Sequence, residues 1–210
     1  MKRIQRLLLA ATLLGLSGLA NANLSFLSSG SATRTEVFNL AGLPNFAVGT
    51  SLSLGSLVTN SPGVFSFTYL GEESGFMNSL HLSNGLNLFE THAVGTSINA
   101  TMAGTGALPF SFVEIVSPSP SASAQNGGAW SPNTSIGLIG TNLSVLGKTY
   151  AFVLGYNDSA GPATLGDWDD FVIGVNVVSQ VPEPGVYGML AAGLGMLGWV
   201  GRRRKQSEVA

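Results

Sequence analysis

The sequence predicts an all-β fold, a β-sandwich of the jelly-roll type, flanked by two targeting segments. Short apolar or alternating runs recur roughly every 10 to 15 residues, separated by Gly, Ser, Asn and Thr. No run carries the 3.6-residue apolar stripe of a sustained helix. In the clearest strand Phe65, Phe67 and Tyr69 alternate with Ser66 and Thr68, which places three aromatic rings on one face.

Seven segments have the composition of strands. They are residues 35–40, 64–70, 79–82, 87–91, 110–116, 149–155 and 170–178. The last repeats the alternation, with Phe171, Ile173 and Val175 on one face. Residues 117–128 lack any core-forming side chain, so we expect one long exposed loop there.

The first 22 residues predict a secretory signal peptide. Lys2, Arg3 and Arg6 precede an apolar run over residues 7–19, and small residues follow up to Ala22. The run is too short to span a bilayer core of roughly 30 Å. We therefore expect cleavage after Ala22, which leaves residues 23–180 as the mature domain.

The C-terminal end predicts a second targeting element. Pro182 and Pro184 prevent a helix from running through the Val-Pro-Glu-Pro segment. The uncharged residues 185–201 that follow predict a transmembrane helix of roughly 26 Å. Four basic residues at 202–205 cannot cheaply cross the bilayer, so they predict a cytoplasmic end with a tail at 206–210.

This order of three parts, over residues 181–205, resembles the PEP-CTERM sorting signal of Gram-negative bacteria that build exopolysaccharide matrices. The residues that carry the resemblance are Pro182, Glu183, Pro184, Arg202, Arg203 and Arg204. A generic tail anchor would account for the helix and the arginines but not for the Pro-Glu-Pro.

The resemblance implies two partners, the export machinery and an exosortase, a membrane cysteine protease that cuts near the Pro-Glu-Pro. It also implies export across the inner membrane, a transient membrane anchor, and a final place at the cell surface or outside the cell. Exopolysaccharide is a further candidate partner.

The charge balance of residues 23–180 excludes one class of partner. Arg34 and Lys148 are the only basic residues in these 158 positions, against nine acidic ones, so the net charge is −7. Two cations cannot supply the phosphate contacts of a nucleic-acid-binding protein. The absence of cysteine excludes disulfides, a thiol nucleophile and a thiolate metal site.

The densest polar cluster lies near the end of this domain. Gly-Tyr-Asn-Asp at 155–158 and Gly-Asp-Trp-Asp-Asp at 166–170 precede a hydrophobic strand. Carboxylates at such spacing can converge on Ca²⁺, which takes six to eight oxygen ligands. The candidate calcium ligands are Asp158, Asp167, Asp169 and Asp170. The alternative is that these acids only cap a turn, as Asp often does.

Residues 152–158 and 166–172 resemble the G-[FY]-[EN]-D … D-x-D-[YF]-[ND]-D signature of a domain of unknown function in secreted bacterial proteins. Residues 67–78 resemble the Y-x-G-x-E-[AS]-G-[YF]-x-N segment that accompanies it. The resemblance covers about residues 64–178 and implies calcium as the cofactor. Residues 167–170 are one position shorter than the signature, which removes one ligand of the implied set.

The sequence does not indicate an enzyme. His81 and His92, the two histidines, lie apart in the sequence, and no G-x-S-x-G motif occurs. Glu72 and Glu73 are adjacent, so on a strand they would point to opposite faces rather than form an acid pair.

We therefore expect a non-enzymatic structural or extracellular-matrix protein, associated with exopolysaccharide or biofilm and stabilised by calcium. The alternative is a carbohydrate-binding or adhesive module. For that alternative, Trp130 and Trp168 are candidates for stacking on sugar rings, while the competing interpretation is that each covers an edge of the core.

Overall fold

The structure, a computed structural model, describes part of the chain residue by residue. The described residues are 24–35, 40–43, 47–116, 119–128, 134–158, 166–180, 188 and 190–197. The chain divides into two units, one of Ala22–Gln180 and one that combines Met1–Asn21 with Val181–Ala210. Every regular element described in the first unit is a strand, which confirms the all-β prediction.

The first unit contains twelve described strands. The first six are β1 (Leu24–Thr33), β2 (Ser51–Thr59), β3 (Gly63–Gly71), β4 (Met77–Leu82), β5 (Asn87–Phe89) and β6 (Ser97–Met102). The others are β7 (Gly106–Ala107), β8 (Phe110–Val116), β9 (Ser119–Gln125), β10 (Ser135–Val145), β11 (Lys148–Asn157) and β12 (Phe171–Gln180).

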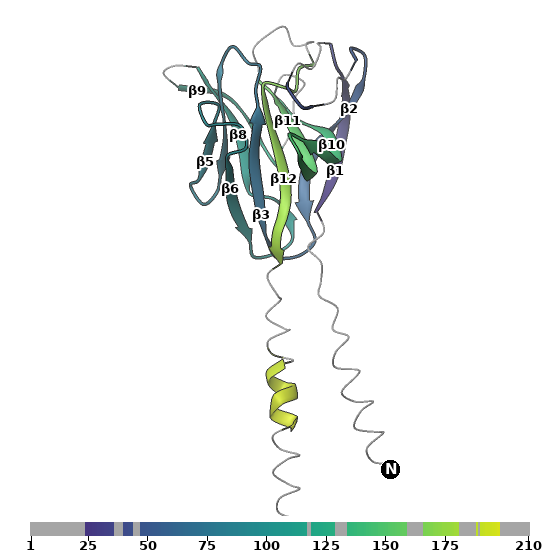
Figure 1. Cartoon of the computed structure of the whole chain (residues 1–210), viewed down its shortest axis with the longest axis vertical. Coiled ribbons are helices and arrows are strands. Elements are labelled where there is room, and N and C mark those ends of the chain that lie inside the picture. The colour runs from purple at the N-terminus through teal and green to yellow at the C-terminus, as the bar shows by residue number, and fades with distance from the viewer. Residues whose placement is uncertain are drawn as a thin grey trace, which may run out of the picture. The chain divides into compact units, whose positions relative to one another are not determined.

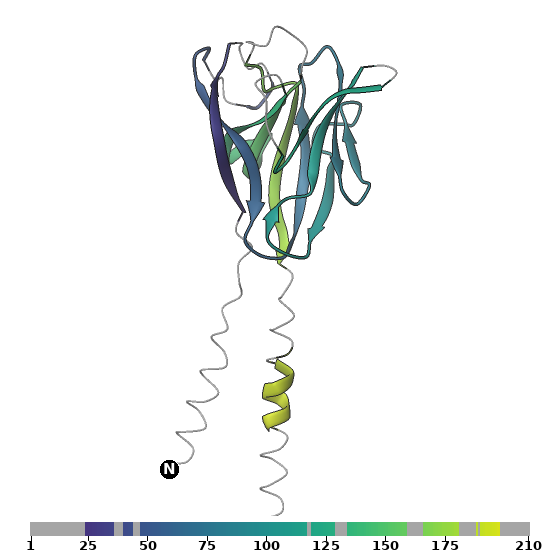
Figure 2. The ribbon, with the colours of Figure 1, turned by 180° about the vertical axis from the view of Figure 1, so that it is seen from behind.

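These strands form two antiparallel sheets. The larger has eight strands in the order β1-β2-β10-β11-β12-β3-β6, with β7 paired to β2, and the smaller has the order β5-β4-β8-β9. In Figure 1, β5, β8 and β9 lie to the left of β12 while β1, β2 and β10 lie to its right, and Figure 2 shows the same arrangement from behind. The two antiparallel sheets agree with the predicted sandwich class, and the jelly-roll connection stays a prediction.

The two sheets pack face to face across one hydrophobic core. Phe112 of β8 stacks on Tyr156 of β11 with ring centroids 5.1 Å apart, and Phe110 meets Phe67 of β3 edge to face at 5.3 Å. Aromatic pairs of this kind bury large apolar area and hold a fixed geometry. The predicted alternation is confirmed, because Phe65 and Phe67 are fully buried in this core.

The larger sheet also buries side chains on its other face. Leu70 and Val172 alternate with core residues of their strands, so they point away from the smaller sheet. They belong to a second cluster whose buried members are Leu70, Ile139, Val145, Tyr150, Val153 and Val172. Trp168 forms a third cluster with Leu52 and Leu54. All three described clusters therefore involve the larger sheet.

The predicted loop at 117–128 is wrong, because Ser119–Gln125 forms β9 and pairs with β8. This segment has weak strand propensity, but its backbone N–H and C=O groups pair with those of β8. Pro120 lies in an edge strand of the smaller sheet, the place where a sheet tolerates proline.

Most of the other predicted strands are confirmed. The segments 64–70, 79–82, 87–91, 110–116, 149–155 and 170–178 correspond to β3, β4, β5, β8, β11 and β12. Of the predicted strand at 35–40, residues 36–39 lie outside the described part, and Thr35 and Leu40 are not in a strand. Besides β9, the strands β1, β2, β6, β7 and β10 were not predicted.

The predicted targeting segments lie almost wholly outside the described residues. Within the predicted transmembrane helix at 185–201, residues 188 and 190–197 are described and helical. None of the described helical residues belongs to a helix long and apolar enough to cross a membrane. The signal peptide at 1–22, the transmembrane helix and the tail at 206–210 stay predictions.

Candidate functional site

Trp168 anchors the Asp-rich segment 166–170 against the larger sheet. Only 1% of this residue is exposed, and its Nε1 donates a hydrogen bond to Ser135 Oγ over 3.0 Å. The indole lies against Gly137, where an added Cβ would meet its Cδ1 at 2.7 Å, and the backbone of Trp168 approaches Gly155. The two glycines therefore leave the space that the tryptophan fills. The interpretation that Trp168 covers the core is confirmed.

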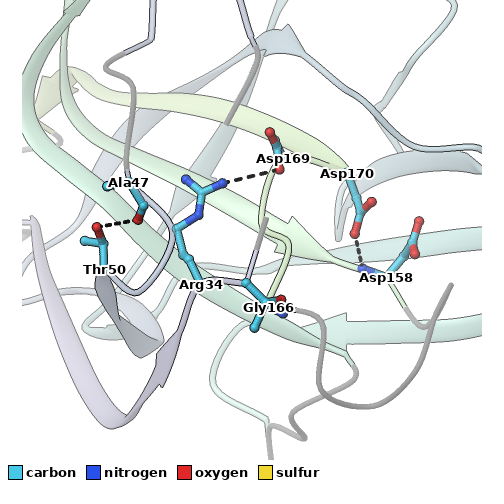
Figure 3. Close-up of polar contacts among 8 residues, drawn as sticks. Arg34, Ala47, Thr50, Asp158, Gly166, Asp169 and Asp170 are labelled. Carbon is cyan, nitrogen blue, oxygen red and sulfur yellow. Dashed lines mark hydrogen bonds and ion pairs between the residues drawn. The ribbon is translucent and has the colours of Figure 1, made fainter. Parts of the chain in front are cut away.

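The next residue, Asp169, pairs with a buried cation (Figure 3). Arg34 Nη2 lies 3.8 Å from Asp169 Oδ1, and the two side chains are 0% and 1% exposed. Burial lowers the pKa of Arg34, and the charges of Asp169, Asp167 and Glu73 act in the opposite direction. A buried charge is costly unless an opposite charge accompanies it. Arg34 is therefore the counter-charge that lets Asp169 lie inside the protein.

Backbone contacts hold Arg34 in this place. Its N–H donates to the carbonyl of Thr50 over 3.0 Å, and its own carbonyl accepts from the N–H of Gly49 over 2.9 Å. The adjacent Thr35 accepts a hydrogen bond on Oγ1 from the N–H of Gly166 over 2.7 Å. Hydrogen bonds thus link the residues that follow β1 to the start of the Asp-rich segment, although the two are far apart in the sequence.

Asp158 and Asp170 form a second group (Figure 3). The N–H of Asp158 donates to Asp170 Oδ2 over 2.7 Å. Asp158 Oδ2 accepts from Ser74 Oγ over 2.6 Å and from Asn78 Nδ2 over 2.9 Å. Asn78 Nδ2 also lies 3.3 Å from the carbonyl oxygen of Asp170. This network joins the end of β11 and the start of β12 to the start of β4, and so links the two sheets.

Burial shifts the proton equilibria of this second group. Burial and, second to it, the charge of Asp158 raise the pKa of Asp170 to about 8, against the opposing effect of the hydrogen bond from the Asp158 backbone. Burial also raises the pKa of Tyr156, as do the charges of Asp158, Glu114 and Asp170. At pH 7 the Asp170 carboxyl is therefore mainly protonated.

The structure thus separates the four predicted calcium ligands. Asp169 faces Arg34, Asp158 and Asp170 contact each other, and Asp167 is half-buried. Within the described ranges, no group of three or more His, Asp or Glu side chains is arranged to hold a metal ion. The described geometry fits an internal polar network, and calcium binding stays a prediction without support from it.

Sequence reasoning missed three residues of this network. Ser74 and Asn78 lie within residues 67–78, the segment that accompanies the Asp-rich signature. Arg34 gave a usable signal, because one of two basic residues in an acidic domain is the natural partner for a buried carboxylate. The six residues of the sorting signal, Pro182, Glu183, Pro184, Arg202, Arg203 and Arg204, lie outside the described residues.

Comparison with known proteins places a family motif at the C-terminal end. Residues 180–205 match the PEP-CTERM protein-sorting motif. Neither a curated protein nor a solved structure matches the chain. The match begins at the last residue of β12 and contains all six predicted sorting residues. The chain therefore carries the sorting signal of a PEP-CTERM exosortase substrate.

Proposed function

We propose that this protein is an exported structural component of the cell surface or extracellular matrix, which an exosortase sorts and which performs no catalysis. The observation that carries the proposal is the PEP-CTERM match at 180–205, which begins where the β unit ends. Cleavage near Pro182 would separate the sorting segment from an intact β unit. The β unit is then the part that the cell exports.

The state of the acidic residues supports a structural role. Asp158, Asp169 and Asp170 are each more than 90% buried and engaged with other parts of the protein. A general acid or base must reach its substrate directly or through one water. These acids instead form an ion pair and hydrogen bonds that connect the ends of β1, β4, β11 and β12, as a stabilising network does.

Processing in cells tests the proposal. In cells that contain the exosortase, the full chain should be shortened and leave the membrane fraction, and in cells without it the chain should keep its full length. Glu183→Ala should also block shortening, whereas Glu208→Ala, an acidic residue beyond the matched segment, should not. Equal processing with and without the exosortase would contradict the proposal.

Calcium stabilisation is part of the proposed role that thermal melting can decide. A ligand present at a hundred times its dissociation constant stabilises a folded protein by about 2.7 kcal/mol. If Asp158, Asp167, Asp169 and Asp170 bind calcium, millimolar calcium should raise the melting temperature measured in EDTA. Identical melting curves in EDTA and in millimolar calcium would contradict calcium binding. Arg34 would then be the counter-charge for this part of the protein.

A carbohydrate-binding role is the second candidate, but Trp168 does not support it. The indole is buried, so it offers no face for a sugar ring. Trp130 lies outside the described residues. Any sugar-binding surface among the described residues must therefore use other side chains.

A further inference from the structure

The smaller sheet presents a row of uncharged polar side chains. Cross-strand pairing aligns Asn87 of β5 with His81 of β4, His81 with Ser111 of β8, and Ser111 with Gln125 of β9. Residues directly opposite each other on paired strands point to the same face of a sheet. These four side chains, which we call the polar row, therefore cross all four strands. Strands about 4.8 Å apart give the row a length of about 14 Å.

The polar row lies on the face turned away from the core. Leu80, Leu88, Phe112 and Ala124 are neighbours of the row along β4, β5, β8 and β9, and all four are buried in the core between the sheets. Successive side chains of a strand point to opposite faces. Accordingly, Gln125 is exposed, and Asn87, His81 and Ser111 are half-buried.

A groove follows part of this row. It has a volume of about 430 Å³, and its lining includes His81, Ser111, Val113, Ser123 and Gln125. This volume lies within the range of small-molecule sites. Its lining contains no Asp, Glu, Lys or Arg. Burial lowers the pKa of His81, so the imidazole is neutral at pH 7.

The polar groups of the groove are available for a ligand. Among the described residues, the side chains of Ser111, Ser123 and Gln125 make no hydrogen bond. Hydroxyl and carboxamide groups both donate and accept hydrogen bonds. Ser79 Oγ donates to the carbonyl of Val113 over 3.3 Å and lies 3.0 Å from His81 Nε2. Ser79 Oγ therefore engages Nε2, which leaves Nδ1 of His81 as the ring nitrogen open to a ligand.

We propose that this groove binds an uncharged, hydroxyl-rich saccharide chain. Sugar hydroxyls are neutral groups that both donate and accept, which matches the lining side chains. An anionic ligand would find no cation there, and a cationic ligand would find no carboxylate. Phe89, half-buried and 6.3 Å from the His81 ring, adds an aromatic surface beside the row. The inference rests on the second candidate function and is independent of sorting, because no groove residue belongs to the sorting signal.

Binding to defined polysaccharides tests the inference. The full chain is purified in a zwitterionic detergent without a sugar headgroup, and its affinity is measured for dextran, galactomannan and cellulose, with the anionic polysaccharide alginate for comparison. We expect binding to at least one uncharged polymer and none to alginate. His81→Ala combined with Gln125→Ala should weaken that binding about tenfold or more, because both hydrogen-bonding groups are lost.

Matched variants show whether the loss belongs to the groove. Asn99→Ala combined with Thr101→Ala removes two exposed polar side chains from β6 of the larger sheet and should leave the affinity unchanged. Ser123→Trp should block the groove by size from an exposed strand position. The inference is overturned if no uncharged polymer binds, if alginate binds best, or if both groove variants bind as the wild type does. Loss of sorting with binding intact would leave it standing.

Discussion

The Asp-rich segment and the outer face of the smaller sheet use polar residues in opposite ways. In the segment, Asp169 and Asp170 are charged or ionisable groups buried inside the protein, and each contacts another part of the chain. On the sheet face, Ser111 and Gln125 are neutral and exposed or half-buried, and their side chains make no hydrogen bond among the described residues.

This difference shows that a conspicuous charge pattern does not reveal which polar side chains keep free hydrogen-bonding groups. A cluster of acids stands out in a sequence, but once buried it must be neutralised inside the protein, and its groups are then occupied. Single Ser, His and Gln residues on separate strands do not stand out. Pairing of the strands brings them together. Among the described residues, the side chains of Ser111 and Gln125 make no hydrogen bond, and His81 uses one ring nitrogen.

The largest expected effect comes from Trp168→Ala. Removing a fully buried tryptophan costs about 3–5 kcal/mol of stability, because the cavity left beside Gly137 and Gly166 cannot close completely. Urea unfolding of the full chain should show this loss. Phe89→Ala, which removes a half-buried aromatic ring beside the polar row, should cost clearly less. Equal losses would mean that the segment is not anchored by Trp168.

Arg34→Ala should have the next largest effect, about 3 kcal/mol. It leaves Asp169 buried without its counter-charge, and breaking a buried pair on one side is strongly destabilising. Lys148→Ala is the matched control, because Lys148 is the other basic residue of the domain and lies exposed 5.3 Å from the Tyr150 ring. That control should cost no more than about 1 kcal/mol. Similar losses in urea unfolding would show that Arg34 does not neutralise the segment.

The pH dependence of stability should report Asp170. Its pKa is raised to about 8 in the folded protein, against about 3.9 in the unfolded chain, so folding takes up a proton between these values. The stabilisation is fully present below pH 4 and is lost as the pH rises towards 8, by at most about 1.4 kcal/mol per pH unit.

Asp170→Asn tests this dependence, because the carboxamide keeps an oxygen for the Asp158 N–H and cannot ionise. Urea unfolding at pH 5, 6, 7 and 8 should show a smaller decline in the variant than in the wild type. If the free energy of unfolding fell equally with pH in the variant and the wild type, the proton taken up on folding would belong to another group.

The smallest expected effect on stability comes from the polar row. Ser111→Ala and Gln125→Ala should each change the free energy of unfolding by no more than about 0.5 kcal/mol, because neither side chain holds other described residues in place. Asn78→Ala on the neighbouring strand β4 should cost about 1–3 kcal/mol, since it removes a buried donor from Asp158. Thermal melting of the three variants makes the comparison. A row variant as unstable as Asn78→Ala would contradict the division between the two regions.

The sequence by itself determined features that depend on local pattern. The alternation of Phe65, Phe67 and Tyr69 predicted a strand with one buried face, because side chains of a strand alternate whatever lies around them. The Pro-Glu-Pro and the arginines predicted the sorting signal, because such a signal is one continuous segment of the sequence and does not depend on the fold. The acidic balance predicts no nucleic-acid partner, because net charge is a sum over residues and needs no fold to be known.

The tertiary structure decided which residues meet. Asp169, a candidate metal ligand by sequence, lies beside Arg34 in the fold, although 134 positions separate them in the sequence. Pairing with β8 made Ser119–Gln125 a strand despite its weak propensity, because the backbone groups of β8 supply hydrogen-bond partners to every non-proline residue that lies opposite them in register. The same pairing set Gln125 beside Ser111 and so completed the polar row. Contacts of this kind depend on strand order and register, which no local pattern in the chain encodes.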